Sequence, residues 1–484
     1  MNILILNPPF LKNFSRPQRS PAVTKSGTLY YPLWLSFTAG VLEEAGHNVA
    51  FFDAPADDYS LDDIISKIED APPKLIVLDT STPSIDNDVK VCDQLKTKFI
   101  DSFIILVGTH VSALPQEVLS KSRNIDAIAC MEYEYTIKEL AEVLEKNGDL
   151  STIKGIVYRN CCDVFTNPPR EFITDLDMLP FVSKTYKKYL NIRKYFNPNA
   201  LFPMVTIIAS RGCPFQCIFC VYPQTMMGRK PRFRSAKNVV DEMEYIKNNF
   251  PDVKSIFFED DTLTSVKKYC TELCEEIIKR NLQISWTANS RADVDLETLK
   301  LMKKSGCHML CVGFESGNQK ILENMKKSMT LEKMHKFVKD AKEAEILVHG
   351  CFMVGLPGET QETMQQTLDL SKALNPDTAQ FYPIMVYPGT EAYNWYKDNG
   401  LLLTDNFSEW LTADGLHNSV IRTGDLTGHE LVEFCDRARK EFYLRPQYIL
   451  RKLKQMILHP EDIGRTLKSA KTFFKYLFRG SFSK

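Results

Sequence analysis

Short apolar segments alternate with helix-period segments along most of the chain, and this alternation restricts the possible folds more than any other feature of the sequence. The first strand-like segments are residues 2–6, 49–52, 75–78, 103–107 and 125–129. Strands and helices that alternate at this spacing are typical of βαβ units around a parallel sheet. Residues 1–150 are therefore predicted to form a doubly wound, Rossmann-like α/β domain, which is a usual domain size.

Polar residues follow several of these strands, where ligands of such a sheet bind. The candidates are Asn7 and Pro8, Ser81, Gly108 and His110, and Glu132. No G-x-G-x-x-G sequence follows the first strand, so a dinucleotide is disfavoured. Taken singly, His110 could instead cap a helix or face solvent, and Glu132 could simply favour the start of the next helix.

The chain changes character near residue 151 and again near residue 203. Residues 151–202 include proline-rich stretches and are predicted to be a linker. Strand-like and helix-like segments then alternate again over residues 203–395. Repeated strand–helix units favour a barrel, in which active sites lie at the carboxyl ends of the strands.

Three cysteines follow the first strand of this second block, in the pattern Cys213-x3-Cys217-x2-Cys220. Thiolates are soft ligands that suit iron–sulfur clusters and zinc. A structural zinc site usually has four ligands, whereas the next cysteine is Cys270, well downstream. We therefore interpret the triplet as the ligands of three irons of a [4Fe-4S] cluster, whose fourth iron stays open.

The triplet, with the aromatic Phe219 before its third cysteine, resembles the motif of the radical S-adenosylmethionine superfamily. The resemblance extends over residues 203–395 and implies a partial (β/α)6 barrel. In that family the open iron chelates S-adenosylmethionine, and one electron cleaves this cofactor to a 5′-deoxyadenosyl radical. A flavodoxin- or ferredoxin-type electron donor is implied as well.

Charged residues at two later strand ends suit the same cofactor. One of Glu259, Asp260 and Asp261 could accept hydrogen bonds from the cofactor ammonium, and the sequence does not decide which. Arg291 could bind its carboxylate, because a guanidinium is a forked partner for that group. The alternative for Arg291 is an ion pair at the surface.

The resemblance also implies roles for residues that follow the next strands. Glu315 and Ser316 stand where the family binds ribose hydroxyls, and Gly355 would let the backbone approach the adenine. The alternative for the glycine-rich segment around Gly355 is an ordinary turn.

The order of the two blocks resembles the cobalamin-binding class of the superfamily, in which the N-terminal domain holds a corrinoid against the barrel mouth. The layout is similar to the anaerobic Mg-protoporphyrin cyclase and to hopanoid-associated members. Thr109 and Met131 stand where this class usually has glycine. No D-x-H-x-x-G motif is present, so cobalamin is expected without a histidine lower ligand.

The charge is unevenly distributed, although the net charge is only -1. Residues 437–484 carry a net charge of about +10 by residue count, so residues 396–484 are predicted to cover the barrel and end in a basic helical tail. In the last predicted helix, apolar residues between 463 and 477 share one face, which either docks on the protein or lies on an anionic membrane. No nucleic-acid-binding module accompanies the basic tail, so no nucleic-acid partner is expected.

No apolar segment is long enough to span a membrane and no signal peptide begins the chain, so we expect a cytoplasmic protein, peripheral on the inner membrane face if the tail binds lipid. The favoured function is methyl transfer from methylcobalamin to carbon of a small molecule, possible classes being lipids and isoprenoids. One alternative is a cyclase or rearrangement enzyme for lipid, isoprenoid or tetrapyrrole-like substrates. The other is a non-catalytic iron–sulfur redox or sensory protein.

Overall fold

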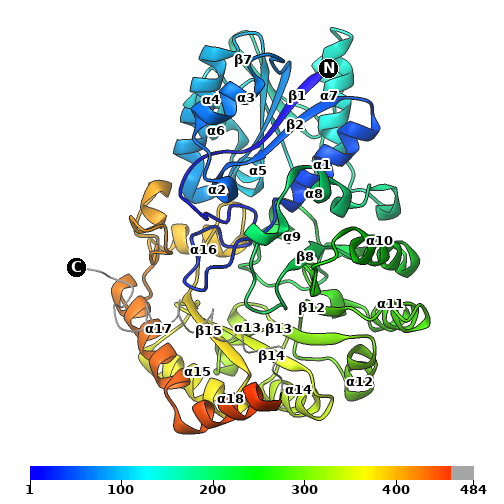
Figure 1. Ribbon diagram of the computed structural model, residues 1–484. Helices are drawn as coiled ribbons and strands as arrows, with labels where there is room; N and C mark the ends of the chain where they lie inside the picture. The colour runs from blue at the N-terminus through cyan, green and yellow to red at the C-terminus, as the bar shows by residue number, and fades with distance from the viewer. Residues whose placement is uncertain (459–484) are drawn as a thin grey trace.

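The structure is a computed structural model that describes residues 1–458. It contains an N-terminal α/β domain, drawn at the top of Figure 1, and a second parallel sheet with its helices below it. The predicted helix between residues 463 and 477 lies outside the described residues. No helix within residues 1–458 combines the length and the apolar character that crossing a membrane would require.

The N-terminal sheet has the strand order β2-β1-β3-β4-β5-β6-β7. Its first five strands are parallel, which confirms the doubly wound fold. They are β1 (Asn2–Asn7), β2 (Asn48–Asp53), β3 (Leu75–Asp79), β4 (Phe103–Val107) and β5 (Ala127–Ala129). Every residue of β3 is buried, as expected for a central strand between two helix layers.

The antiparallel hairpin of β6 (Ile156–Asn160) and β7 (Asp163–Thr166) extends this sheet into residues that the sequence assigned to the linker. The helices that cover the sheet are α1 (Leu33–Glu44), α2 (Ala54–Asp57), α3 (Leu61–Ile68), α4 (Ile85–Lys98), α5 (Thr109–Ala113), α6 (Pro115–Lys121) and α7 (Glu134–Glu145). The linker contributes α8 (Val182–Tyr189), which packs on α1.

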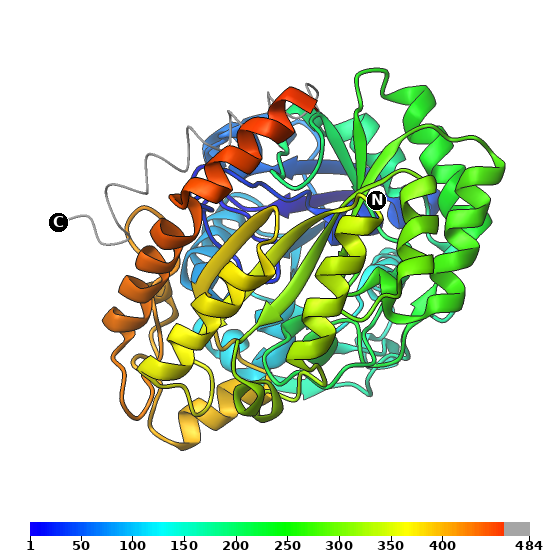
Figure 2. The same ribbon diagram turned by 90° about the horizontal axis from the view of Figure 1, so that it is seen from below.

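The second sheet has six parallel strands in the order β15-β14-β13-β12-β11-β8. Its two outer strands do not pair, so the barrel stays open and matches the predicted partial (β/α)6 fold (Figure 2). The strands are β8 (Met204–Ile207), β11 (Ser255–Phe258), β12 (Ser285–Ser290), β13 (Cys307–Glu315), β14 (Leu347–Val354) and β15 (Thr378–Pro383). The helices after them are α10 (Ala236–Asn249), α11 (Lys267–Lys279), α12 (Leu296–Lys304), α13 (Gln319–Asn324), α14 (Leu331–Glu343) and α15 (Gln361–Leu374).

Two segments connect the domains at the barrel mouth. The N-terminal loop, residues 8–32, runs from β1 to the barrel as the dark blue trace of Figure 1. After α16 (Glu391–Asp398), the 3-10 turn η6 (Phe407–Trp410) contacts the turn η1 (Thr82–Ser84) that follows β3. The chain then returns along β15 as α17 (Gly428–Tyr443) and ends its described part in α18 (Pro446–Leu458).

Candidate active site

The three cysteines lie on one loop, residues 212–231, which we call the cluster loop. It joins the short strands β9 (Ser210–Arg211) and β10 (Arg232–Phe233) and contains the helix α9 (Val221–Thr225). Gly212 has a φ of 84°, and a side chain there would overlap the carbonyl oxygen of Lys230, so only glycine suits the position. Arg229 donates to the carbonyl oxygens of Phe215 and Cys217, which ties the loop to itself.

The thiols of the triplet are placed differently. Cys213 and Cys217 are buried and Cys220 is partly exposed. The Cys220 thiol donates a hydrogen bond to Cys217 and thereby lowers the pKa of Cys217, which favours its thiolate form. Among residues 1–458, no three His, Cys, Asp or Glu side chains converge closely enough to hold a single metal ion. Three thiols spread over one loop suit a [4Fe-4S] cluster, in which each thiolate binds a different iron.

Of the three acidic residues after β11, Glu259 and Asp261 share Arg19 as a partner, whereas Asp260 binds the chain around β9. The Asp260 carboxylate accepts from the Ala209 backbone N–H at 3.1 Å and from the Ser210 hydroxyl at 2.5 Å, so it holds the start of the β9 strand. Glu259 pairs with Arg19 of the N-terminal loop, but its Oε2 atom is buried and has no partner among the described residues. Burial raises the pKa of Glu259 and of the partly exposed Asp261.

Glu315 is the second carboxylate with a spare oxygen. Its Oε1 lies 2.8 Å from the ammonium of Lys327, and its buried Oε2 has no partner within the described chain. The residue has a φ of 68°, a strained conformation for glutamate. Gly313 makes room for it, because a side chain at that position would overlap the Glu315 carboxylate. The Ser316 hydroxyl is hydrogen-bonded within the barrel, because it lies 3.3 Å from the hydroxyl of Thr367.

Arg291 connects two other parts of the site. Its Nη2 donates to the carbonyl oxygens of Lys327 and Ser328, at 3.0 and 2.9 Å, and its guanidinium lies 3.7 Å from the centre of the Phe215 ring. It therefore holds the Lys327 loop against the cluster loop. The ring of Phe219 lies 6.0 Å from the Lys327 ammonium.

Gly355 lies near the C-terminal segment. Its carbonyl oxygen accepts from the Tyr396 hydroxyl, and a side chain there would meet Leu431 and Ile421.

Sequence reasoning missed three residues of this site, namely Arg19, Gly313 and Lys327. Lys327 is the second of two adjacent lysines after α13, and Arg19 lies in a loop of the other domain, so neither stands at a strand end that would mark it. Gly313 lies within β13, where an interior glycine is a signal of close approach by another group.

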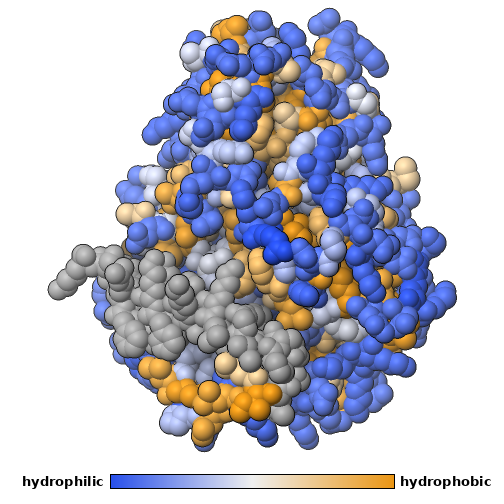
Figure 3. All heavy atoms as spheres, in the orientation of Figure 1, coloured by the Kyte–Doolittle hydropathy of each residue, from blue (hydrophilic) through white to orange (hydrophobic). Residues whose placement is uncertain are grey.

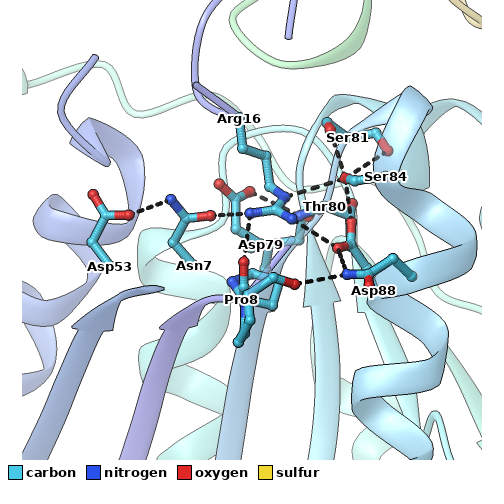
Figure 4. Close-up of polar contacts among 12 residues, drawn as sticks. Asn7, Pro8, Arg16, Asp53, Asp79, Thr80, Ser81, Ser84 and Asp88 are labelled. Carbon is cyan, nitrogen blue, oxygen red and sulfur yellow. Dashed lines mark hydrogen bonds and ion pairs between the residues drawn. The ribbon is translucent and has the colours of Figure 1, made fainter. Parts of the chain in front are cut away.

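The corresponding edge of the N-terminal sheet is filled by the chain itself (Figure 4). Arg16 of the N-terminal loop donates to Asn7, to the carbonyl oxygen of Pro8 and to Ser84, and pairs with Asp88 at 2.9 Å. The side chains of Arg16 and Asp88 are completely buried.

Two further hydrogen bonds extend this network. Asn7 donates onward to Asp53 at 2.7 Å, and Ser81 is bonded to Ser84 at the same distance.

The predicted residues after β4 and β5 lie beside this network. Nδ1 of His110 lies 3.2 Å from the Thr82 hydroxyl, its ring packs edge-on against Phe407, and its Nε2 has no partner among the described residues. Burial lowers the pKa of His110 to about 3, so the imidazole is neutral. Gly108 has a φ of 119°, and a side chain there would overlap the carbonyl oxygen of Thr80. Glu132 instead binds two arginines of the barrel.

These residues suit a corrinoid in kind, because hydroxyl groups and a spare imidazole nitrogen match a ligand rich in amides and phosphate. However, Asn7, Ser81 and His110 are each only 1% exposed. Arg16 and η6 cover them, so a corrinoid reaches these groups only after the N-terminal loop or η6 moves.

Comparison with known proteins agrees with both halves of this description. Residues 207–371 match the family model of the radical SAM superfamily, and residues 19–141 match that of the B12 binding domain. An uncharacterized methyltransferase of Pyrococcus horikoshii is 32% identical over 436 residues, which cover 90% of this chain and 92% of the relative. The anaerobic magnesium-protoporphyrin IX monomethyl ester cyclase of Rubrivivax gelatinosus is 30% identical over 76% of this chain and 66% of its own length.

Among solved structures, the cobalamin-dependent S-adenosylmethionine radical enzyme OxsB with aqua-cobalamin and S-adenosylmethionine bound superposes with a TM-score of 0.71. It is 15% identical, and the superposition covers 99% of this chain and 72% of OxsB. At this identity the likeness concerns the fold. The two family matches and the Pyrococcus relative show that the chain belongs to the radical SAM superfamily, in the class whose members carry an N-terminal B12-binding domain.

Proposed function

We propose that this protein is a cobalamin-dependent radical S-adenosylmethionine enzyme that transfers a methyl group to a carbon atom of a small molecule. The proposal rests on the residues at the carboxyl ends of the barrel strands, which we call the barrel edge. The cluster loop that follows β8 carries the three thiols, and two buried carboxylates, Glu259 after β11 and Glu315 at the end of β13, each have one oxygen that has no partner in the described chain. Buried polar atoms without partners are rare and lower the stability of the fold. These two oxygens are therefore suited to accept hydrogen bonds from donor groups of a bound ligand.

Residues of the chain have distinct roles in this proposal. When bound, the cluster supplies the electron that cleaves S-adenosylmethionine and the corrinoid supplies the methyl group. Glu259 and Glu315 accept hydrogen bonds from the ammonium and ribose hydroxyl groups of S-adenosylmethionine. Lys327 compensates the charge of Glu315. The pKa of Cys217 is lowered mainly by the hydrogen bond from Cys220, and the positive charge of Lys327 lowers it further, which favours the thiolate. Arg291 and Phe215 stack and keep the cluster loop against the barrel.

The substrate is expected above the interior of the barrel. Cys311, Cys351 and Tyr382 are partly exposed on β13, β14 and β15, and Gln380 is exposed. Relatives act on small molecules such as the tetrapyrrole of the cyclase. A mixed lining of thiols, a phenol and an amide suits a largely apolar small molecule with a few polar groups. An external flavodoxin- or ferredoxin-type donor belongs to the same proposal, because the cluster must be reduced.

A second candidate function is ring closure or rearrangement without methyl transfer. The covered edge of the N-terminal sheet favours it, since Arg16 and η6 lie over the residues that a corrinoid would contact. The similarity to the magnesium-protoporphyrin cyclase supports it as well.

Peripheral membrane contact is a further part of the proposal. On α18, Leu450, Leu453 and Ile457 are 66%, 51% and 78% exposed, close to Lys454. Figure 3 shows apolar side chains at the edge of the molecule where Figure 1 places α18. An exposed apolar stripe beside basic residues is typical of helices that lie on anionic lipid.

The proposed chemistry is tested by anaerobic reconstitution with iron and sulfide, followed by a low-potential chemical reductant and S-adenosylmethionine, with and without cobalamin. Methyl transfer predicts both 5′-deoxyadenosine and S-adenosylhomocysteine, the latter only when cobalamin is present. If 5′-deoxyadenosine forms but no S-adenosylhomocysteine is detected under either condition, the second candidate function replaces the first.

A further inference from the structure

The hairpin that carries the cluster loop is closed by two like charges. Arg211 of β9 and Arg232 of β10 are directly opposed in antiparallel register, so their side chains lie on the same face. Both are buried, Arg211 completely. Like charges in this position repel, and burial strengthens the repulsion, so the hairpin needs an anion between its two strands.

The N-terminal domain supplies that anion. One oxygen of Glu132 lies 3.2 Å from Nη1 of Arg211, and the other lies 2.7 Å from Nη1 of Arg232. Glu134 adds a second contact to Arg211 at 2.6 Å. Both glutamates follow β5, and their side chains are 3% and 2% exposed. The two arginines and two glutamates are together electrically neutral, although they belong to different domains.

The surroundings keep this arrangement rigid. The Arg211 guanidinium lies 5.1 Å from the ring centres of both Trp34 and Phe37 on α1. Glu132 also accepts from the backbone N–H of Ile173 at 2.9 Å, and Arg232 donates to the carbonyl oxygen of the same residue at 2.7 Å. The N-terminal domain, the linker and the base of the cluster loop therefore meet at Glu132.

We propose that Glu132 is a positioning residue for the iron–sulfur cluster: it is the counter-ion that keeps the cluster loop closed. The barrel then depends on the N-terminal domain to retain its cluster, whether or not that domain holds a corrinoid. This inference rests on the proposed assignment of the cluster to Cys213, Cys217 and Cys220.

The test compares Glu132→Gln with Glu132→Gln/Arg232→Met in the full chain. Glu132→Gln removes one of the two negative charges beside the two buried arginines. We expect this variant to lose its reconstituted cluster to an iron chelator about tenfold faster than the wild type. Removing one arginine as well relieves the repulsion, so the double variant is expected to recover most of the retention. Cluster loss is followed by visible absorbance, well below the unfolding temperature of every variant.

A matched control is Glu242→Gln, because Glu242 is the buried partner of Arg234, at 2.6 Å, within the barrel. It is expected to keep the wild-type rate of cluster loss. Hydrogen exchange of residues 212–231 in the cluster-free chain provides a second readout, and we expect faster exchange only in Glu132→Gln.

Two results would overturn the inference: retention in Glu132→Gln equal to that in Glu242→Gln, or no recovery in the double variant. A wild-type chain that takes up no cluster would instead refute the proposed function and, with it, the premise of this inference.

Discussion

The two domains present the same kind of sheet edge to each other, but the edges differ in how their polar groups are satisfied. Each edge has a buried ion pair, Arg16–Asp88 in the N-terminal domain and Lys327–Glu315 in the barrel. Asp88 has partners on both oxygens, namely Arg16 and Ser84. Glu315 and Glu259 each retain a buried oxygen without a partner in the described chain.

The ion pair of the N-terminal edge therefore belongs to a completed network, whereas the carboxylates of the barrel edge have oxygens that a ligand could use. A fully satisfied buried network rigidifies the fold, whereas a partly satisfied one costs stability until a ligand completes it. The barrel edge therefore bears the cost that binding S-adenosylmethionine would recover. At the N-terminal edge the Arg16–Asp88 network is satisfied, and the buried Nε2 of His110 beside it has no partner among the described residues. A corrinoid must displace part of the covering to reach that nitrogen.

The largest expected effect comes from the cluster loop. Cys220→Ala removes one of three thiolates, and we expect loss of the [4Fe-4S] absorbance and no detectable 5′-deoxyadenosine. Cys351→Ala is the matched control, because Cys351 is also a partly exposed barrel cysteine but lies on β14. If Cys220→Ala retains a cluster like that of Cys351→Ala, the assignment of the triplet is wrong.

The next largest effect compares the two buried ion pairs. Asp88→Asn leaves the Arg16 guanidinium buried without its counter-ion, and Glu315→Gln does the same to Lys327. Each is expected to lower the free energy of unfolding by about 3–5 kcal/mol in urea titrations. Only Glu315→Gln should also weaken S-adenosylmethionine binding, measured by calorimetry on folded protein. Equal loss of binding in Asp88→Asn would remove the distinction between the edges.

The third effect is a pH dependence of the N-terminal edge. Burial lowers the pKa of His110 to about 3, whereas histidine in the unfolded chain titrates near 6.5. The folded state therefore binds fewer protons between these values, and the contribution of His110 to stability is lost as pH falls below about 6.5. Between pH 7.5 and 5, the wild type is expected to lose about 2 kcal/mol more stability than His110→Gln.

Buried carboxyl groups act in the opposite direction, but they cancel in this comparison. Burial raises the pKa of Asp53 to about 6 and that of Asp79 to about 7, in both proteins alike. Parallel stability curves for the wild type and His110→Gln across this pH range would contradict a buried neutral imidazole.

The smallest effect concerns backbone strain. Met131 has a φ of 63°, which explains why glycine is usual at this position in the class. Met131→Gly should relieve strain and raise the free energy of unfolding by up to about 1 kcal/mol. Glycine also makes the unfolded chain more flexible, and this offsets part of that gain. A loss of stability would mean that the packing of the methionine side chain outweighs the strain.

Much of the fold was predictable because it depends on local patterns. Apolar alternation identified the parallel strands of both sheets. The linear spacing of Cys213, Cys217 and Cys220 was enough to predict a cluster loop without any tertiary information, and that assignment stays a prediction. Residues 155–158 were predicted as a strand and lie in or next to β6, but β7 was missed because it is exposed along its length and has no apolar pattern.

The partners within the site were not predictable, because they depend on side chains distant in sequence. Asp260 and Glu259 are neighbours in the chain, yet one holds the β9 strand and the other faces Arg19, which lies 240 residues away. Glu132 was expected to contact a cofactor, and its position between Arg211 and Arg232 follows only from the docking of the two domains.

The most direct test of the central claim is the response of the reconstituted, reduced cluster to S-adenosylmethionine. Adding S-adenosylmethionine is expected to change the electron paramagnetic resonance spectrum of the cluster and to yield 5′-deoxyadenosine. Glu315→Gln is expected to require more S-adenosylmethionine for the same spectral change. A cluster spectrum that S-adenosylmethionine leaves unchanged, with no 5′-deoxyadenosine formed, would refute the proposed radical chemistry and favour a redox or sensory protein.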